Sequence, residues 1–144
     1  MKISRTLLKK IEAEALSAYP KEACGLLVGR AGGDEIVDAI PSCNLASGED
    51  EFLIDPKVHI KAQRELREQG LAVIGVYHSH PSGDSAPSSS DKISTNLSDF
   101  WWLIVAFKGQ KITDCGLFCA IKGKFAKNER NFVREDLQIE ENPV

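Results

Sequence analysis

The residues with the clearest potential for chemistry are two histidines, His78 and His80, at the end of an apolar run. Side chains alternate between the two faces of a strand, so His78 and His80 project from one face while Ser79 points to the other. Two imidazoles at this spacing are suited to hold a zinc ion between them. Pro81 follows directly and ends the strand, which places the pair at its C-terminal edge. A hydrogen-bonded histidine pair inside a core is the alternative.

A third zinc ligand must come from elsewhere in the chain, and Asp91 is the favoured residue. It follows a loop over 81–87 and lies in the first turn of a helix predicted over 88–97, so the chain can return beside the histidines. Asp84, in the middle of the loop, is the rival ligand. Two neutral imidazoles and one carboxylate leave the fourth tetrahedral position to water, which is the layout of a catalytic zinc site. The prediction is therefore one Zn²⁺ per chain, with a bound water whose pKa falls from about 15.7 to around 7.

A hydrolase of this kind also needs a general base, which accepts the proton of the water and later delivers it to the leaving group. Glu22 is our candidate, because it lies just ahead of an apolar strand predicted over 24–29. The alternative for Glu22 is a solvated charge beside Lys21.

The strand that carries the histidines, predicted over 71–80, is the expected centre of the fold. It begins with an unbroken apolar run, which indicates a strand covered on both faces, as in a sheet with helices on each side. The predicted fold class is α/β, a single domain with a mixed β-sheet flanked by helices. Ser4 and Asp55 are suited to cap its first two helices. Further strands are predicted over 24–29, 35–40, 101–107 and 112–121, and helices over 4–18, 56–69 and 88–97.

The composition is that of one globular domain, with 144 residues of which 42% are hydrophobic and 27% charged. Residues 1–139 are predicted to form this domain and 140–144 a flexible tail. A net charge of −3 makes nucleic acid a poor partner. No apolar run approaches the roughly 20 residues of a membrane span and no signal peptide is recognisable, so we expect a cytoplasmic protein. The four cysteines lack Cys-x-x-Cys spacing, and we expect no disulfide framework.

The polar residues together resemble the motif of the JAMM (MPN+) zinc metalloprotease family. That motif has a Glu ahead of the first strand, then His-x-His-Pro, six residues, Ser, two residues and Asp. Here the same order reads Glu22, His78-Ser-His80-Pro, Ser88 and Asp91. The likeness extends over nearly the whole chain, because the order of the helices and strands also agrees. It implies the JAMM/MPN fold, a three-layer sandwich similar to that of cytidine deaminases.

The resemblance also implies a role for each residue. His78, His80 and Asp91 would bind zinc, Glu22 would be the general base, and the zinc-bound water the nucleophile. The Ser88 hydroxyl would stabilise the oxyanion of the tetrahedral intermediate. The adjacent residues Ser89 and Ser90 are suited to cap the following helix.

The family cleaves peptide or isopeptide bonds after the C-terminal Gly-Gly of ubiquitin or ubiquitin-like proteins. The short segments after Asp55 and Asp91 resemble minimal prokaryotic members, so the expected partners are ubiquitin-like or sulfur-carrier proteins. Two alternatives stay open: a non-catalytic MPN binding module and a zinc-dependent small-molecule amidase or deaminase. The deaminase signature of His-x-Glu followed by Pro-Cys-x-x-Cys is absent.

Two aromatic segments have less specific patterns. Phe52, with Leu53 and Ile54, is expected to pack in the core or, as the alternative, to line a substrate channel. Of the adjacent Trp101 and Trp102, one is expected in the core and the other facing a helix or a surface groove.

Overall fold

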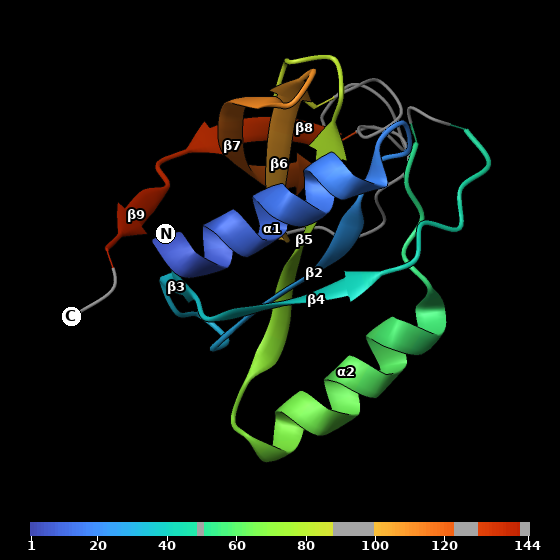
Figure 1. Ribbon diagram of the computed structural model, residues 1–144. Helices are drawn as coiled ribbons and strands as arrows, with labels where there is room; N and C mark the ends of the chain where they lie inside the picture. Colours follow the sequence, from blue (N-terminus) through green and yellow to red (C-terminus); the bar gives the residue numbers. More distant parts are fainter. Residues whose placement is uncertain (49–50, 88–99, 123–129, 142–144) are drawn as a thin grey trace.

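Strand β5, the predicted central strand, lies in the middle of a six-stranded sheet with the order β4-β2-β5-β6-β7-β8. The computed structural model describes residues 1–48, 51–87, 100–122 and 130–141, and Figure 1 shows their arrangement. The elements are β1 (Lys2–Ser4), α1 (Arg5–Ala18), β2 (Cys24–Gly29), β3 (Glu35–Ile36), β4 (Asp38–Ser42), α2 (Pro56–Glu68), β5 (Ala72–His80), β6 (Trp101–Lys108), β7 (Lys111–Lys122), β8 (Arg130–Glu135) and β9 (Gln138–Glu140).

The sheet is mixed, as predicted. Strand β5 runs antiparallel to β2 and parallel to β6, while the remaining pairs are antiparallel. The neighbouring residues Val76 and Tyr77 point to opposite faces, and both are buried, with exposures of 2% and 1%. Both faces of the central strand are therefore covered, which is why its sequence lacks the alternation of a half-exposed strand.

Helix α1 covers one face of the sheet. Ser4 caps it by accepting a hydrogen bond from the Leu7 amide at 3.2 Å, which satisfies one of the unpaired N–H groups of the first turn. Its buried side chains recur at helical spacing, so one side of the helix faces the sheet. They share a cluster with the sheet residues Tyr77, Leu103 and Phe107; the helical members are Leu8, Ile11 and Ala15.

Helix α2 covers the opposite face, so the predicted three-layer arrangement is confirmed. Its N-cap Asp55 accepts a hydrogen bond from the Lys57 amide at 3.0 Å. The helix ends before Gly70, whose φ of +71° lies in the left-handed region that favours glycine. Ala62 and Leu66 pack in a second cluster with sheet residues that include Val76, Trp102 and Phe118. Of the two tryptophans, Trp102 is buried at 2% exposure and Trp101 is only partly buried, as the sequence predicted.

Three short strands form a second sheet that the sequence did not predict. Its order is β3-β1-β9, and both pairs are parallel. Segments of two or three residues are too short to show periodicity, and their partners are distant in the chain. Strand β9 includes Glu140, one residue beyond the expected end of the domain at 139, and Glu141 forms an ion pair with Arg5 at 2.6 Å.

The helix predicted over 88–97 lies outside the described residues. No helix within the described ranges is long and apolar enough to cross a membrane. All four cysteines are free thiols, which agrees with the absence of a disulfide framework.

Candidate metal centre

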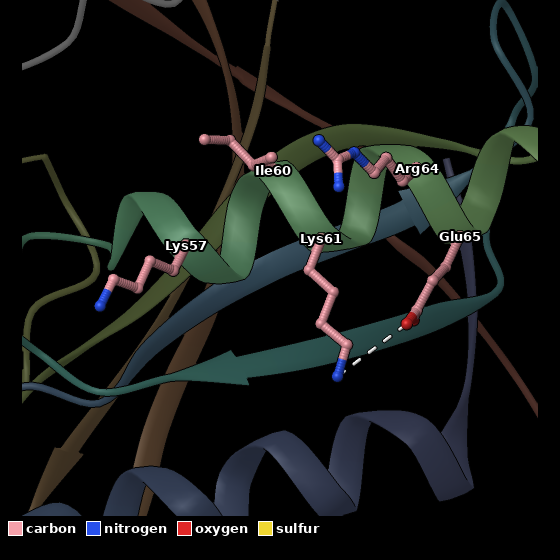
Figure 2. A pocket seen from close by; sticks show the side chains of 5 residues that line it. All are labelled: Lys57, Ile60, Lys61, Arg64 and Glu65. Atoms are coloured by element: carbon pink, nitrogen blue, oxygen red, sulfur yellow. Dashed lines mark ion pairs between the residues drawn. The ribbon is translucent and has the colours of Figure 1, made fainter.

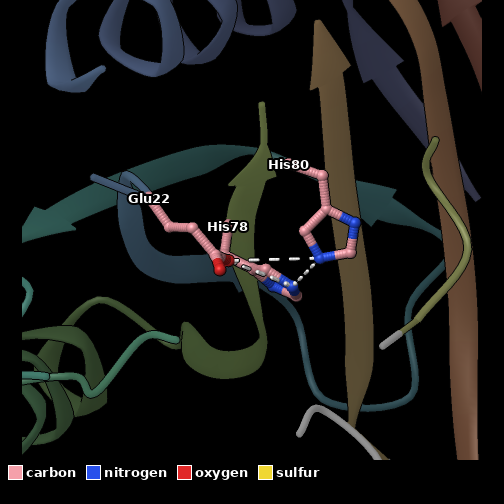
Figure 3. Close-up of side chains that lie close together, drawn as sticks. All are labelled: Glu22, His78 and His80. Carbon is pink, nitrogen blue, oxygen red and sulfur yellow. Dashed lines mark hydrogen bonds and ion pairs between the residues drawn. The ribbon is translucent and has the colours of Figure 1, made fainter. Parts of the chain in front are cut away.

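Three of the predicted site residues come together in the structure: Glu22, His78 and His80 (Figure 3). Glu22 precedes β2, whereas both histidines lie near the C-terminal end of β5. All three side chains are buried, with exposures of 3%, 0% and 7%. One potential ligand atom from each lies within 4.8 Å of the others. The structure therefore brings the predicted general base next to two of the three predicted zinc ligands.

The sheet register brings Glu22 to the histidines although the sequence separates them widely. Strand β2 lies antiparallel to β5, with Cys24 opposite His78. Beyond this pair, Ser79 holds the segment in front of β2: its hydroxyl accepts a hydrogen bond from the Ala23 amide at 2.8 Å, and its own amide donates to the Ala23 carbonyl at 3.0 Å. Ser79 points away from the site, as predicted, and fixes the backbone next to Glu22.

The distances within this group fit a metal ion. The Nε2 atoms of His78 and His80 are 3.0 Å apart, close to the roughly 3.3 Å expected between two nitrogen ligands of a tetrahedral zinc ion. The Glu22 Oε1 atom lies 3.9 Å from the first nitrogen and 4.0 Å from the second. These longer distances suit a carboxylate that acts on a neighbouring water. A cation bound next to the two ring nitrogens would also offset the electrostatic cost of burying the Glu22 carboxylate.

The His80 ring is held in one tautomer. Its Nδ1–H donates to the main-chain carbonyl of Asp84 at 2.9 Å, so in the neutral ring the Nε2 atom keeps its lone pair for a metal. Asp84 was the rival third ligand. Its carboxylate accepts a hydrogen bond from the Ala86 amide at 2.9 Å, so this side chain stabilises the turn of the loop.

Aromatic side chains form the wall behind the histidines. The Phe52 ring stacks on His78 with centroids 4.2 Å apart and an interplanar angle of 17°. Trp102 packs edge-on against both rings, at 5.4 Å from His78 and 5.5 Å from Phe52. Phe52 also packs against the α2-side core cluster. Phe52 thus packs against the core, as one of the two interpretations predicted, and also contacts a candidate ligand; its place in a substrate channel stays a prediction.

Asn44 is a residue of this region that the sequence interpretation missed. Its amide group donates to the carbonyls of Glu22 at 3.0 Å and Glu51 at 2.9 Å. Its Oδ1 atom accepts from the amides of Ala46 at 2.9 Å and Leu53 at 3.0 Å. Asn44 therefore ties the backbone of Glu22 to the segment around Phe52. An asparagine in an irregular polar segment gives no sequence signal of such a role.

The buried thiol of Cys24, next to the site, is a poor nucleophile. Burial, reinforced by the nearby carboxylates of Glu14 and Glu22, raises the pKa of Cys24 to about 12. Cys24 is therefore a neutral thiol at physiological pH, and a thiolate nucleophile is not available there.

The other two predicted site residues, Ser88 and Asp91, lie outside the described residues.

A separate pocket of about 390 Å³ lies on the exposed side of α2 (Figure 2). It is lined by flexible charged side chains and one exposed isoleucine: Lys57, Ile60, Lys61, Arg64 and Glu65. None of these five is a predicted site residue, and the lining has no metal-binding pair of the kind seen at the end of β5.

Comparison with known proteins gives a family match over most of the chain. Residues 4–115 match the family described as prokaryotic homologues of the JAB domain. This range contains Glu22, both histidines, Ser88 and Asp91.

Among curated proteins, the chain is 38% identical over 90 residues to a probable TtuB-protein conjugate cleaving protease from Thermus thermophilus. That match covers 62% of this chain and 59% of the relative. The chain is also 23% identical over 133 residues to a CysO-cysteine peptidase from Mycobacterium tuberculosis, which covers 92% of this chain and 91% of the relative.

Solved structures show the same architecture. A protein from Desulfitobacterium hafniense superposes with a TM-score of 0.81 at 28% identity, over 98% of this chain and 93% of that chain. A structure described as a metalloprotease-like zinc site in the proteasome and signalosome, JAMM, superposes with a TM-score of 0.54 at 26% identity, over 96% of each chain.

Proposed function

Because the chain belongs to the family of prokaryotic homologues of the JAB domain, we propose that it is a JAMM-type metallopeptidase. It cleaves the peptide or isopeptide bond that follows the C-terminal Gly-Gly of a ubiquitin-like or sulfur-carrier protein. The observation that carries this proposal is the convergence of Glu22, His78 and His80 in one buried group. The names of the two curated relatives, one a cleaving protease of TtuB conjugates and the other a CysO-cysteine peptidase, support the substrate class.

Zinc is the metal that we propose, with His78, His80 and Asp91 as its protein ligands. Two imidazoles and a carboxylate with an open fourth position are typical of catalytic zinc, and one structural neighbour is described as a zinc site. Zinc would supply a Lewis acid and a water that is easily deprotonated near neutral pH. A cytoplasmic location stays a prediction from the sequence.

The residues of the chain divide the remaining work. Glu22 accepts a proton from the attacking water and passes it to the departing amine, which amide hydrolysis requires because the amine is a poor leaving group unless protonated. The Asp84 carbonyl keeps the His80 ring oriented, and the Phe52 and Trp102 rings exclude water from behind His78. The Ser88 hydroxyl would donate to the oxyanion that develops on the scissile carbonyl.

The test is cleavage of a ubiquitin-like protein ending in Gly-Gly that is linked to a reporter protein. Mass spectrometry should find a product ending in Gly-Gly, and a chelator should abolish its formation until zinc is restored. The Glu22→Gln variant should keep zinc and lose roughly 10²- to 10⁴-fold in kcat, the range for general acid–base catalysis. The matched control is Glu68→Gln, on the exposed side of α2, which should cleave at the wild-type rate.

Three results would contradict the proposal in different ways. Full activity of Glu22→Gln would reject the general base. Tight binding of the Gly-Gly tail without cleavage would favour a binding module, and chelator-sensitive release of ammonia from small amides would favour an amidase.

A further inference from the structure

Three side chains close to the metal centre form a polar cluster to which the proposed function assigns no role. They are Ser85, Asp114 and Arg134, called here the Arg134 cluster. The two terminal nitrogens of Arg134 each lie 3.2 Å from a different oxygen of Asp114. The Ser85 hydroxyl donates to Asp114 Oδ2 at 2.5 Å, and Arg134 Nη1 also donates to that hydroxyl at 3.4 Å. A two-pronged contact of this kind fixes direction as well as distance.

The register of the sheet places this cluster beside the site. His80 pairs with Ala106 on β6, and Ala106 pairs with Asp114 on β7. Directly paired residues project from the same face, so Asp114 lies on the face of His80, two strands and roughly 10 Å away. Arg134 reaches it from β8, where it pairs with Phe118 and lies over that ring at 5.8 Å.

The loop that follows β5 is fastened to this cluster. Ser85 is buried at 2% exposure, and it enters the space above Gly116, where a Cβ atom would lie only 2.8 Å from the Ser85 hydroxyl oxygen. A second contact holds the preceding turn, because the Thr113 hydroxyl donates to the Gly83 carbonyl at 2.9 Å. Asp84 lies between these two attached residues, and its carbonyl is the acceptor for His80 Nδ1–H.

We propose that the Arg134 cluster is a positioning device for the metal ligand His80. By holding Ser85, it keeps the Asp84 carbonyl against Nδ1 and so presents Nε2 to the metal. The cluster acts on the ligand through the loop, and Ser85, Asp114 and Arg134 are positioning residues. This inference rests on the proposed function for the presence of the metal, whereas the orientation of the ring is a property of the protein alone.

The electrostatics of the cluster agree with a geometric role. Hydrogen bonds from Arg134 and Ser85 hold the pKa of Asp114 below its usual value, so the carboxylate stays an ionised acceptor across the neutral range. The side chains of Arg134 and Asp114 are 55% and 40% exposed. An ion pair this exposed contributes little to global stability, so loss of the cluster should change the loop more than the fold.

The first test measures the tautomer of the His80 ring, and the exchange rate of its Nδ1 proton, in metal-free protein by ¹⁵N NMR of the imidazoles. The wild type should show one neutral tautomer, with a protonated Nδ1 that exchanges slowly with solvent. Asp114→Asn and Ser85→Ala should each give a mixture of tautomers and an exchange rate that is at least several-fold faster. The Ser85→Ala variant removes only one hydroxyl, so it remains informative if Asp114→Asn folds poorly.

The second test measures zinc affinity by competition with a chromophoric chelator, independently of catalysis. Each variant should bind zinc roughly 10-fold more weakly, which is the lower end of the loss seen when an outer partner of a ligand is removed. The double variant should lose little more than either single variant, because both act through the same loop. The matched control is Glu141→Gln, which removes another arginine–carboxylate pair at 2.6 Å from Arg5 and should leave tautomer and affinity unchanged.

The two tests separate this inference from the proposed function. A single wild-type tautomer in both variants, together with unchanged zinc affinity, would overturn the positioning role and leave the metallopeptidase intact. A wild-type protein that binds no zinc would contradict the proposed function, while the NMR experiment would still decide whether the cluster orients His80.

Discussion

At the scale of single residues, Asn44 connects the proposed general base to the aromatic wall of the site. Its side-chain amide donates two hydrogen bonds and accepts two, and so contacts four backbone groups. One of these is the carbonyl of Glu22, and two others flank Phe52. An isosteric change can therefore separate the hydrogen bonds that Asn44 donates from those that it accepts.

We predict that Asn44→Asp lowers kcat about 10-fold and destabilises the protein by about 1 to 2 kcal/mol, because an oxygen replaces the donor beside two carbonyls. The two hydrogen bonds that the side chain accepts from the Ala46 and Leu53 amides should be retained. KM should change less than kcat, since the Glu22 backbone shifts while the surface for the substrate tail is retained. Steady-state kinetics and urea unfolding check this prediction.

The control for this change is Gln63→Glu, the same amide-to-acid replacement on an exposed position of α2. It should leave both measurements unchanged. A loss of stability in Asn44→Asp with an unaltered kcat would mean that Asn44 supports the fold without orienting Glu22.

At the scale of elements, a side-chain hydrogen bond links α1 to the central strand, in addition to their apolar packing. The Tyr77 hydroxyl donates to Glu14 Oε2 at 2.7 Å. Burial raises the pKa of Glu14 above its ordinary value, against the opposing effects of Tyr77 and Lys10. The folded protein thus holds the Glu14 proton more tightly than the unfolded chain does, so this residue makes the free energy of unfolding fall as pH rises from about 4.5 through its folded pKa.

We predict that Glu14→Gln removes this part of the pH dependence. The amide oxygen can still accept from Tyr77, and the cost of burying a charge is gone. The variant should be at least as stable as the wild type at pH 7, and its advantage should shrink towards pH 4. Urea unfolding at several pH values measures this, with the exposed Glu68→Gln as the control. An advantage that grows as pH falls would contradict the assigned sign.

The sequence predicted the larger elements well because their signals are local. A cap residue, an apolar period and a terminating glycine lie within one helix, as at Ser4, Asp55 and Gly70. The segment predicted as one strand over 35–40 divides instead: β3 joins the small sheet, and β4 pairs with β2. That division depends on the position of β1, which no pattern within 35–40 encodes.

At the scale of the whole molecule, the site depends on contacts between segments that are distant in sequence. Glu22 reaches the histidines because β2 lies against β5, and Arg134 reaches the loop because β8 lies at the far side of β7. The motif in the sequence predicted Glu22, His78 and His80 as one group. It could not predict Asn44, the contact between Phe52 and His78 or the Arg134 cluster, since these follow from the register of the assembled sheets.

The last prediction concerns the stability of the entire fold. His78 and His80 are buried beside Glu22, so a metal ion held by the two histidines should stabilise the native state and not the unfolded chain. At a free zinc concentration 100 times Kd, such binding adds about 2.7 kcal/mol. For a domain of this size that corresponds to a rise in Tm of roughly 5 to 10 °C. Thermal unfolding with zinc and with excess chelator measures the difference.

Variants identify which residues carry this stabilisation. His80→Ala should abolish the zinc-dependent rise in Tm, whereas Glu22→Gln should retain it, because the proposed base acts on the water and does not hold the metal. His59→Ala removes the remaining histidine, on α2, and should also retain the rise. If Glu22→Gln lost the rise as fully as His80→Ala, Glu22 would be a metal ligand. The 3.9 and 4.0 Å distances from its oxygen to the two imidazole nitrogens favour the base, because direct ligands of one zinc ion lie closer together.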